Sequence, residues 1–471
     1  MASRLRPLSG LDAGFLYLED SGTPMHVGSL MLLQAPARRG YDFHQALLDL
    51  LSERLPKAPA LRRILQFAPM GLGHPMWRDG GEVDLEHHIS RRKLRAPGTD
   101  KQLHALVAKL HAELLPRDRP LWKFVVIEGH HSCCVALHTR VHHALLDGQG
   151  GVALAQVLLD LEARQPAKRG RGAKSPEVAP PPGALAIART SLRASAQQLA
   201  RMFRALPETV RLARDSAGDA RGLIGRIRDN VLLAPRTAFN AQVSTERSFS
   251  AVSLPLSDIK RLSRAFGVSL NDVVMALVAH ALRQFLLTQR RLPTKSLIAA
   301  MPVSLREAGN ADANNQVSMV QVELATQVRD DLERLRRIAA ATGEIRERVG
   351  ALRHLIPTDF PGLAAPIWAS GLSRLWARGR IAEKLPALAN LVVSNVPGPP
   401  MPLYLAGARL LHNYPVSIVT HGLGLNITVQ SYNGQLEVGV IACRNAVPDA
   451  AVVTRALQEA LERYLQLQNG I

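Results

Sequence analysis

The stretch from His138 to Gly151 carries the residue types that point most clearly to chemistry. It reads HTRVHHALLDGQGG, with adjacent histidines at positions 142 and 143, an aspartate at 147 and a glycine at 148. A histidine with an unperturbed pKa of about 6.5 is largely neutral at physiological pH and can accept a proton. We therefore predict that this segment supplies a general base.

Only one of the two histidines can face a given cleft, because successive residues of an extended backbone point to opposite sides. His143 suits the role of the base, and we expect His142 to be structural, with a buried and hydrogen-bonded ring. Asp147 either orients an imidazole or anchors the loop by a salt bridge, and we favour the anchor. Gly148 supplies the backbone freedom that a tight turn or a close ligand requires.

Two other chemistries are disfavoured at this segment. A zinc site needs a third ligand at a suitable distance, and adjacent histidines do not readily share an ion, so we expect no metal. A covalent mechanism needs an activated nucleophile, but Cys133 and Cys134 lie in a predicted apolar strand, where a thiol is normally inert packing. With Cys443 they are the only cysteines, which implies no disulfide framework.

The elements that must position the motif form two similar halves. The motif lies between a predicted strand over 133–140 and a predicted helix over 152–161, at a junction that exposes polar side chains beside a helix N-terminus. Apolar periodicity predicts further helices over 42–55, 101–115 and from Ser269, and strands over 124–128, 296–305 and 421–432. A pseudo-duplicated α/β architecture is the simplest interpretation.

Length and composition predict more than one folded unit. At 471 residues, with 47% hydrophobic and 21% charged residues, the chain is globular and long enough for two domains. Between them, residues 164–228 hold 14 Lys and Arg against four acids and begin with a Pro- and Gly-rich run. We predict an N-terminal domain over 1–163, a basic linker over 164–245 and a C-terminal domain over 246–471.

The linker contains a basic amphipathic segment from Ala184 to Asp215. Such a helix either lies on an anionic membrane or lipid-droplet surface, or connects the domains and packs its apolar stripe on the protein. We favour the connecting helix, because apolar stripes usually belong to a core.

The formal charge of +19 requires an anionic partner. Nucleic acid, a membrane surface and a phosphorylated small molecule such as coenzyme A all qualify, but aromatic residues make up only 4% and no base-stacking motif occurs, which argues against nucleic acid. No apolar run reaches the roughly 20 residues of a spanning helix, and the N-terminus lacks a secretory signal. We expect a cytosolic protein that does not cross a bilayer.

Several segments besides HHALLDG at 142–148 point to one family. In chain order they are RPLSGLDAGFLYLEDSGTPMHVGSL at 6–30, RPLWKF at 119–124, SLNDVV at 269–274, PVSLR at 302–306, SNVPGP at 394–399 and HGLGLNITVQSYNG at 421–434. This ordered combination resembles the bacterial bifunctional wax ester synthase/diacylglycerol acyltransferase family.

The resemblance implies a fold of two chloramphenicol-acetyltransferase-like α/β domains, joined by a crossover linker, with an active-site tunnel at their interface. It implies that His143 is the base and that Asp147 is mainly structural. Glu19 and Trp122 fall on motif positions that shape the site, although a tryptophan after Pro-Leu is more often a core anchor than a substrate contact. Asn271 is a candidate oxyanion-side donor, whereas Asn271 and Asp272 together also fit a helix N-terminal pair.

The activity that the resemblance implies is transfer of a fatty acyl group from acyl-CoA, as co-substrate, to diacylglycerol or a long-chain alcohol. No permanently bound cofactor is implied. Such acceptors reside in membranes or lipid inclusions, so a cytoplasmic enzyme would contact the inner membrane or a lipid droplet peripherally. Two alternatives are an HHxxxDG acyltransferase acting on a non-lipid acceptor and an inactive lipid-droplet scaffold.

Overall fold

The structure is a computed structural model of the whole chain. It describes residues 5–67, 73–79, 83–132, 134–145, 154–155, 157–164, 183, 185–193, 196–197, 232–304, 317–352 and 385–470.

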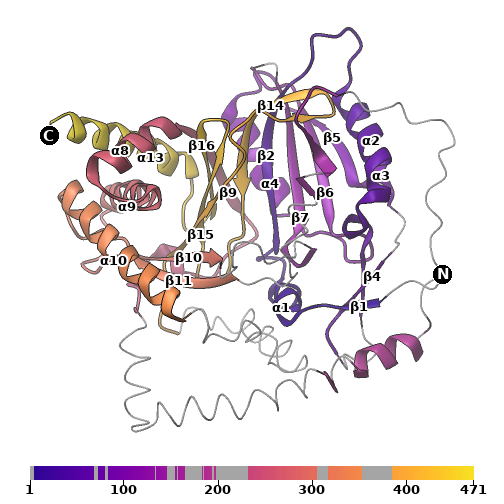
Figure 1. Cartoon of the computed structure of the whole chain (residues 1–471), viewed down its shortest axis with the longest axis horizontal. Helices are drawn as coiled ribbons and strands as arrows, with labels where there is room; N and C mark the ends of the chain where they lie inside the picture. The colour runs from indigo at the N-terminus through magenta and orange to yellow at the C-terminus, as the bar shows by residue number, and fades with distance from the viewer. Residues whose placement is uncertain are drawn as a thin grey trace.

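The N-terminal half is built on a seven-stranded sheet with helices beside it (Figure 1). The order of its strands is β5 (Ile89–Lys93), β6 (Trp122–Glu128), β7 (Val135–His142), β2 (His26–Gln34), β14 (Ala408–Val416), β13 (Tyr404–Leu405) and β8 (Leu159–Asp160). The accompanying helices are α1 (Gly10–Leu18), α2 (Phe43–Arg54), α3 (Leu85–His88) and α4 (Asp100–His111). A small separate sheet joins β1 (Leu5–Pro7), β4 (Met76–Arg78) and β3 (Ile64–Gln66).

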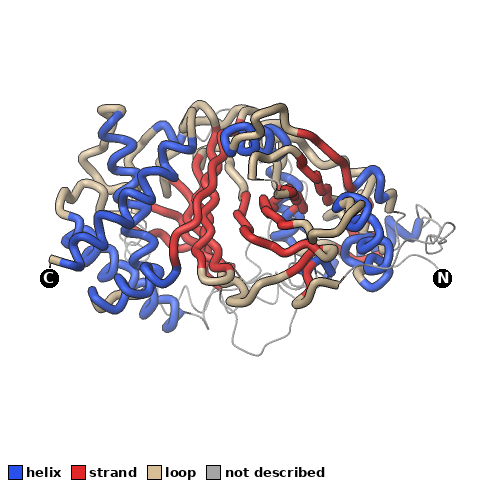
Figure 2. The backbone as a smooth tube through the Cα atoms, turned by 90° about the horizontal axis from the view of Figure 1, so that it is seen from above, coloured by secondary structure: helices blue, strands red, loops and turns tan. Residues whose placement is uncertain are grey.

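The C-terminal half is built on a six-stranded sheet whose helices gather on its outer side (Figures 1 and 2). Its strands, in order, are β11 (Val317–Glu323), β10 (Ile298–Ser304), β12 (Leu391–Val396), β15 (Leu425–Tyr432), β16 (Gln435–Cys443) and β9 (Arg247–Pro255). The helices are α8 (Leu256–Phe266), α9 (Leu270–Thr288), α10 (Asp331–Leu352) and α13 (Ala450–Asn469).

The two sheets repeat one four-stranded pattern. In the first, β5 is parallel to β6, β6 is antiparallel to β7, and β7 is antiparallel to β2. In the second, β12 is parallel to β15, β15 is antiparallel to β16, and β16 is antiparallel to β9. The predicted pseudo-duplicated α/β architecture is therefore present as a repeated topology.

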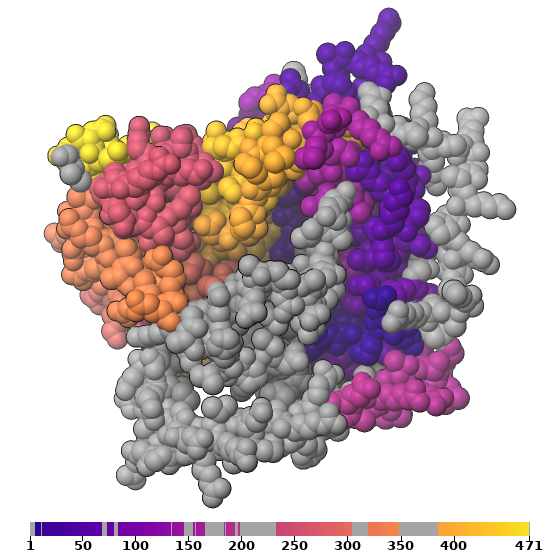
Figure 3. Space-filling view, viewed as in Figure 1, coloured from indigo at the N-terminus to yellow at the C-terminus, as the bar shows by residue number. Residues whose placement is uncertain are grey.

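Two strands from the C-terminal half, β14 and the short β13, belong to the N-terminal sheet. β14 pairs antiparallel with β2 over most of its length, and it also packs closely against β16. At Gly439 a Cβ atom would lie 1.8 Å from the backbone oxygen of Pro415, so only glycine allows this approach of β16 to β14. In Figure 3 the orange and yellow residues of this region lie between the rose-coloured helices and the indigo half.

A hydrophobic cluster shared by both halves joins the two sheets. Leu103 and Val107 of α4 pack with Val125 of β6, and with Phe249 of β9 and Ile441 of β16. Each half also has its own larger core. The α4 helix is therefore held between the two sheets, which fixes their relative position.

Helix α9 is the central helix of the C-terminal core. Its N-cap Ser269 accepts from the backbone of Asp272, whose side chain accepts in return from Ser269, a capping box. Among the described residues this is the one helix long and apolar enough to cross a bilayer, yet 72% of its apolar window is buried in the protein. Its polar residues have protein partners, with Arg283 donating to the Thr326 carbonyl and His280 facing Asp331.

Most predicted elements are confirmed, with shifted ends. The strand predicted over 133–140 is observed over 135–142, so Cys134 precedes it and is only partly buried. The prediction of a helix over 152–161 is wrong at its C-terminal end, because Leu159–Asp160 forms the short strand β8, which pairs with β13. The linker segment predicted over 184–215 lies mostly outside the described residues, which include a short helical stretch at 185–193.

Candidate active site

The two motif histidines lie where strand β7 ends. His142 is the last residue of β7 and pairs with His26 of β2, while His143 begins the 3-10 helix η4 (His143–Leu145). The backbone N–H of His143 donates to the Met25 carbonyl at 2.8 Å, and that of His142 to the Leu121 carbonyl at 2.9 Å. The backbone around the motif is thus fixed on both sides by neighbouring strands.

His142 is fully buried and oriented by two contacts. The backbone N–H of Ala144 donates to its Nδ1 at 3.1 Å, so Nδ1 carries the lone pair. Its proton therefore resides on Nε2, which lies 3.3 Å from a carboxylate oxygen of Glu19. The ring is buried and hydrogen-bonded as predicted, and its structural role stays a prediction.

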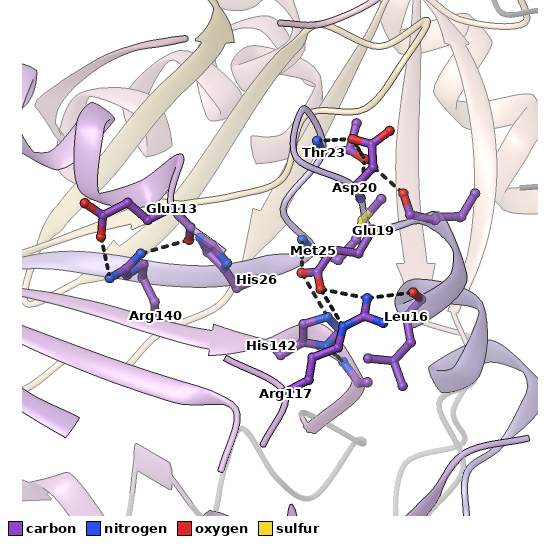
Figure 4. Close-up of polar contacts among 12 residues, drawn as sticks. Leu16, Glu19, Asp20, Thr23, Met25, His26, Glu113, Arg117, Arg140 and His142 are labelled. Atoms are coloured by element: carbon purple, nitrogen blue, oxygen red, sulfur yellow. Dashed lines mark hydrogen bonds and ion pairs between the residues drawn. The ribbon is translucent and has the colours of Figure 1, made fainter. Parts of the chain in front are cut away.

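Glu19 is a buried carboxylate that links α1 to the motif (Figure 4). Besides His142, it accepts from the Met25 backbone N–H at 3.1 Å and from Arg117 at 2.9 and 3.2 Å. Burial alone raises the pKa of Glu19, but the neighbouring His142, then Arg117 and the Met25 backbone N–H, outweigh it and lower the pKa to about 2. The carboxylate is therefore ionised, and it stabilises the Nε2–H tautomer of His142.

The ring of His143 points the other way and stacks on Phe15 of α1. The ring centroids are 4.0 Å apart and the planes 22° from parallel. Burial, followed by the neighbouring His142, lowers the pKa of His143 to about 4, although an interaction with its own backbone carbonyl raises it. Its Nδ1 is buried and has no partner among the other described residues, which leaves Nε2 as the nitrogen that can meet a substrate. At neutral pH this imidazole is uncharged and able to accept a proton.

Trp122 lies in the core of the N-terminal half rather than against His143. Its side chain is 1% exposed, donates from Nε1 to the Leu61 carbonyl at 2.9 Å and stacks on His88 at 4.3 Å. It follows Leu121, whose carbonyl accepts from His142, so it supports the motif through the backbone of β6.

Asn271 and Asp272 occupy the first turn of α9. Asp272 is 1% exposed and accepts from the Ser269 backbone and from the Thr342 hydroxyl, so it acts as a cap. The side chain of Asn271 is half-buried and donates toward the Met301 sulfur at 3.5 Å. Within the described part of the chain, no hydrogen bond or ion pair joins either residue to the motif histidines.

Asp147 and Gly148 lie outside the described residues. Two residues near the motif were missed by the sequence analysis: Phe15, which stacks on His143, and Arg117, which binds Glu19. Phe15 precedes Glu19 by four residues, a spacing that puts both on one face of a helix. This spacing could have suggested that Phe15 lies near the motif. Arg117 has no such signal.

Comparison with known proteins identifies the family. A family model described as the wax ester synthase/diacylglycerol acyltransferase catalytic domain matches residues 8–274, and its C-terminal domain matches residues 313–464. The O-acyltransferase WSD of Acinetobacter baylyi is 32% identical over 98% of this chain and 97% of its own length. The chain belongs to the wax ester synthase/diacylglycerol acyltransferase family.

Solved structures confirm the fold. The wax ester synthase/diacylglycerol acyltransferase from Marinobacter aquaeolei VT8 superimposes with a TM-score of 0.70 and 31% identity, covering 99% of this chain and 100% of that one. The first condensation domain of the calcium-dependent antibiotic synthetase gives a TM-score of 0.56 at 15% identity, covering 99% and 97%, a likeness of fold alone. The predicted fold class of two chloramphenicol-acetyltransferase-like domains is confirmed, and so is the prediction that the chain is an acyltransferase of this family.

Proposed function

We propose that this chain transfers a fatty acyl group from acyl-CoA to the hydroxyl of diacylglycerol or of a long-chain alcohol, with His143 as the general base. The observation that carries the proposal is the neutral, desolvated imidazole of His143, stacked on Phe15 beside a buried ionised glutamate. Membership of the wax ester synthase/diacylglycerol acyltransferase family supports the donor and the two acceptors.

The reaction needs one base that later acts as an acid. Nε2 of His143 takes the hydroxyl proton of the acceptor while the alcohol oxygen attacks the thioester carbonyl carbon. The tetrahedral intermediate then collapses, the carbon–sulfur bond breaks, and the imidazolium returns the proton to the sulfur of coenzyme A. A pKa of about 4 keeps the base neutral between turnovers. No acyl-enzyme forms, and a base of this kind contributes roughly 10²–10⁴-fold.

The neighbouring residues position the base and keep water away. Phe15 covers one face of the His143 ring, which lowers competition from hydrolysis. Glu19, itself paired with Arg117, holds His142 and through it the turn on which His143 lies. We also propose that Asn271 contributes on the oxyanion side, that Asp147 anchors the loop and that Gly148 permits its turn. Trp122 shapes the site from the core.

The proposed domains are residues 1–163, a linker over 164–245 and residues 246–471, with the acyl chain and acceptor meeting in a tunnel between the two halves. The contacts of α4 with β9 and of β14 with β16 support a substrate path near this junction, because they hold both halves next to the motif strand.

Peripheral contact with the inner membrane or a lipid inclusion would deliver the acceptor to a cytoplasmic enzyme. Its support is the basic linker and the exposed apolar side chains of the short helical stretch at 185–193. Leu185 is 83% exposed and Leu192 is 58% exposed, with Arg189 and Arg193 near them in sequence. Apolar and basic side chains on one short helix suit an anionic lipid surface.

Purified protein incubated with palmitoyl-CoA and either a diacylglycerol or hexadecanol tests the proposal. We expect release of free coenzyme A thiol together with triacylglycerol or wax ester, and loss of both in His143→Ala. Ester formation that persists in the variant would refute the role of His143. Absence of turnover by the wild-type protein with both acceptors would refute the lipid acceptor.

A further inference from the structure

A second group of titratable side chains lies far from the motif, where the β6–β7 connection meets the start of α4. Asp100, His130 and His131 each present one potential ligand atom, and the three atoms lie within 4.8 Å of one another. The oxygen of Asp100 is 2.8 Å from Nε2 of His130 and 3.5 Å from Nε2 of His131. Two imidazoles and one carboxylate are a donor set suited to a borderline divalent cation.

These separations fit a tetrahedral ion. With zinc bonds of 2.0–2.1 Å, ligand atoms of a tetrahedral site are roughly 3.3 Å apart, and the two separations involving Asp100, 2.8 and 3.5 Å, lie on either side of this value. Adjacent histidines on an extended strand would point to opposite sides. His130 and His131 lie in a turn instead, and their rings approach to 4.4 Å.

The inner histidine is held for this role. The side chain of His130 is 2% exposed, and its Nδ1 lies 2.7 Å from the Ser132 hydroxyl. When Nδ1–H donates to Ser132, Nε2 carries the lone pair and points at Asp100. Hydrogen bonding of the remote ring nitrogen is how proteins orient histidines that bind metals.

The two backbone segments that carry the ligands are fixed against each other. His131 N–H donates to the Gly98 carbonyl at 2.9 Å, and a Cβ on Gly98 would lie 1.9 Å from the Gly129 carbonyl oxygen. Thr99 and Gln102 form a capping box that fixes the first turn of α4, where Asp100 lies. The ligands therefore need little reorganisation to bind an ion, while the exposed sides of Asp100 and His131 leave a path for its entry.

We propose that Asp100, His130 and His131 bind one zinc-class divalent cation, with water in the remaining position. The ion clips the start of α4 to the β6–β7 connection. Strand β7 runs from this connection to His142, a distance of roughly 25 Å at about 3.3 Å per residue, so the ion takes no part in the chemistry at His143. This proposal departs from our prediction of no metal site, which considered the motif histidines alone.

Titration of chelator-treated full-length protein with Zn²⁺, and with Co²⁺ for its visible absorption, tests the site. We expect one ion per chain, a tetrahedral Co²⁺ spectrum and a rise in Tm with Zn²⁺ concentration. His131→Ala and Asp100→Asn should each weaken binding by at least about 10-fold, and Ser132→Ala by about 10-fold, a typical effect of losing an orienting partner. Mg²⁺ should not compete, because imidazole is a poor ligand for it.

His87→Ala is the matched control. His87 also has a histidine next to it in sequence, the buried His88, whose ring lies 5.4 Å away. In the described part of the chain, however, His87 belongs to no metal-binding group. This variant should bind Zn²⁺ as the wild type does. A wild-type protein that binds no Zn²⁺, or binding that is equal in His131→Ala, Asp100→Asn and wild type, would overturn the proposal and leave a simple His130–Asp100 hydrogen bond.

Discussion

The two halves of the molecule end an equivalent strand in the same way but with different side chains. In the first half His142 pairs with His26, and the next residue, His143, donates its backbone N–H to the Met25 carbonyl. In the second half Cys443 pairs with Arg247, and Arg444 donates its backbone N–H to the Glu246 carbonyl at 3.1 Å. The register is the same at both junctions.

The surroundings of the two junctions differ. Helix α1 precedes β2 and lays Phe15 over His143, so that the imidazole is half-buried and its pKa is lowered. In the described part of the chain between 232 and β9, the 3-10 helix η5 (Ala238–Asn240) and a short connection precede the strand, and Arg444 is exposed to solvent. The repeated backbone therefore supplies the same position in both halves, and in the first half α1 covers it with Phe15.

The largest expected effect comes from replacing with alanine the residue that follows β7, and the comparison is the same replacement after β16. His143→Ala should lower kcat/KM by roughly 10²–10⁴-fold, because it removes the base. Arg444→Ala, at the equivalent position, should leave kcat/KM within about two-fold, since a surface substitution away from the site changes little. Ester formation from palmitoyl-CoA measures both.

Equal losses in these two variants would contradict the comparison, since they would place both junctions at the reaction. Circular dichroism of each variant separates a loss of activity from a loss of folding.

A smaller effect is expected from removing the charge that holds His142. Glu19→Gln keeps the size of the side chain but leaves Arg117 without its carboxylate, and it should lower kcat by about 10–100-fold through misplacement of the turn. It should also lower Tm. Because the pKa of Glu19 falls from 4.5 to about 2 on folding, the stability it adds is complete above about pH 4.5 and is lost as the pH falls toward 2.

Thermal unfolding of wild type and Glu19→Gln at several pH values checks this. The two curves should converge at low pH. A difference in Tm that is independent of pH would mean that packing, and not the charge, is what Glu19 contributes.

Much of the fold could be predicted because its signals are local. The Ser269 cap and the apolar run after it define α9, and alternation and apolar runs define β6, β10 and β15. The place of β14 in the N-terminal sheet could not be predicted, since its pairing with β2 joins segments from opposite ends of the chain. No local pattern records such a partner.

The same distinction applies to the site. His142 and His143 stand out by type and spacing, whereas Arg117 meets Glu19 across 98 residues of chain and is one arginine among many. Trp122 belongs to one of the sequence motifs, but in the structure its ring is buried in the core and its indole N–H donates to a backbone carbonyl. Contacts made by folding, rather than spacing, decide which residues surround His143.

Phe15→Leu should have a moderate effect that is visible in the pH profile. With a base of pKa about 4, wild-type kcat/KM should stay flat as the pH falls from 8 to about 5, and then decline as His143 becomes protonated. Loss of the stacked ring admits water, so the decline should move upward toward pH 6.5, with a loss of about 2–10-fold at neutral pH.

Rates are compared only at pH values where the circular dichroism signal is unchanged, because other buried histidines also bind protons on unfolding. Phe15→Tyr, which keeps a ring for stacking, is the control and should retain the wild-type profile. A Phe15→Leu profile that matches the wild type would show that α1 does not determine the basicity of His143.

The smallest effect is expected at Cys443, the counterpart of His142. Burial raises the pKa of its thiol. Donors on Ser244 and Asn445 and the charge of Arg247 lower the pKa by more than burial raises it, so the pKa lies below its ordinary value. A lowered thiol pKa is a feature of reactive cysteines, yet this side chain is only 2% exposed and an acyl-CoA thioester cannot approach it. Cys443→Ala should therefore retain kcat/KM within about two-fold, since only the junction that α1 covers takes part in the reaction. Mass spectrometry of wild-type protein quenched during turnover should find no acyl group on Cys443, whereas an acylated Cys443 would move the chemistry to the second junction and make His143 a secondary group.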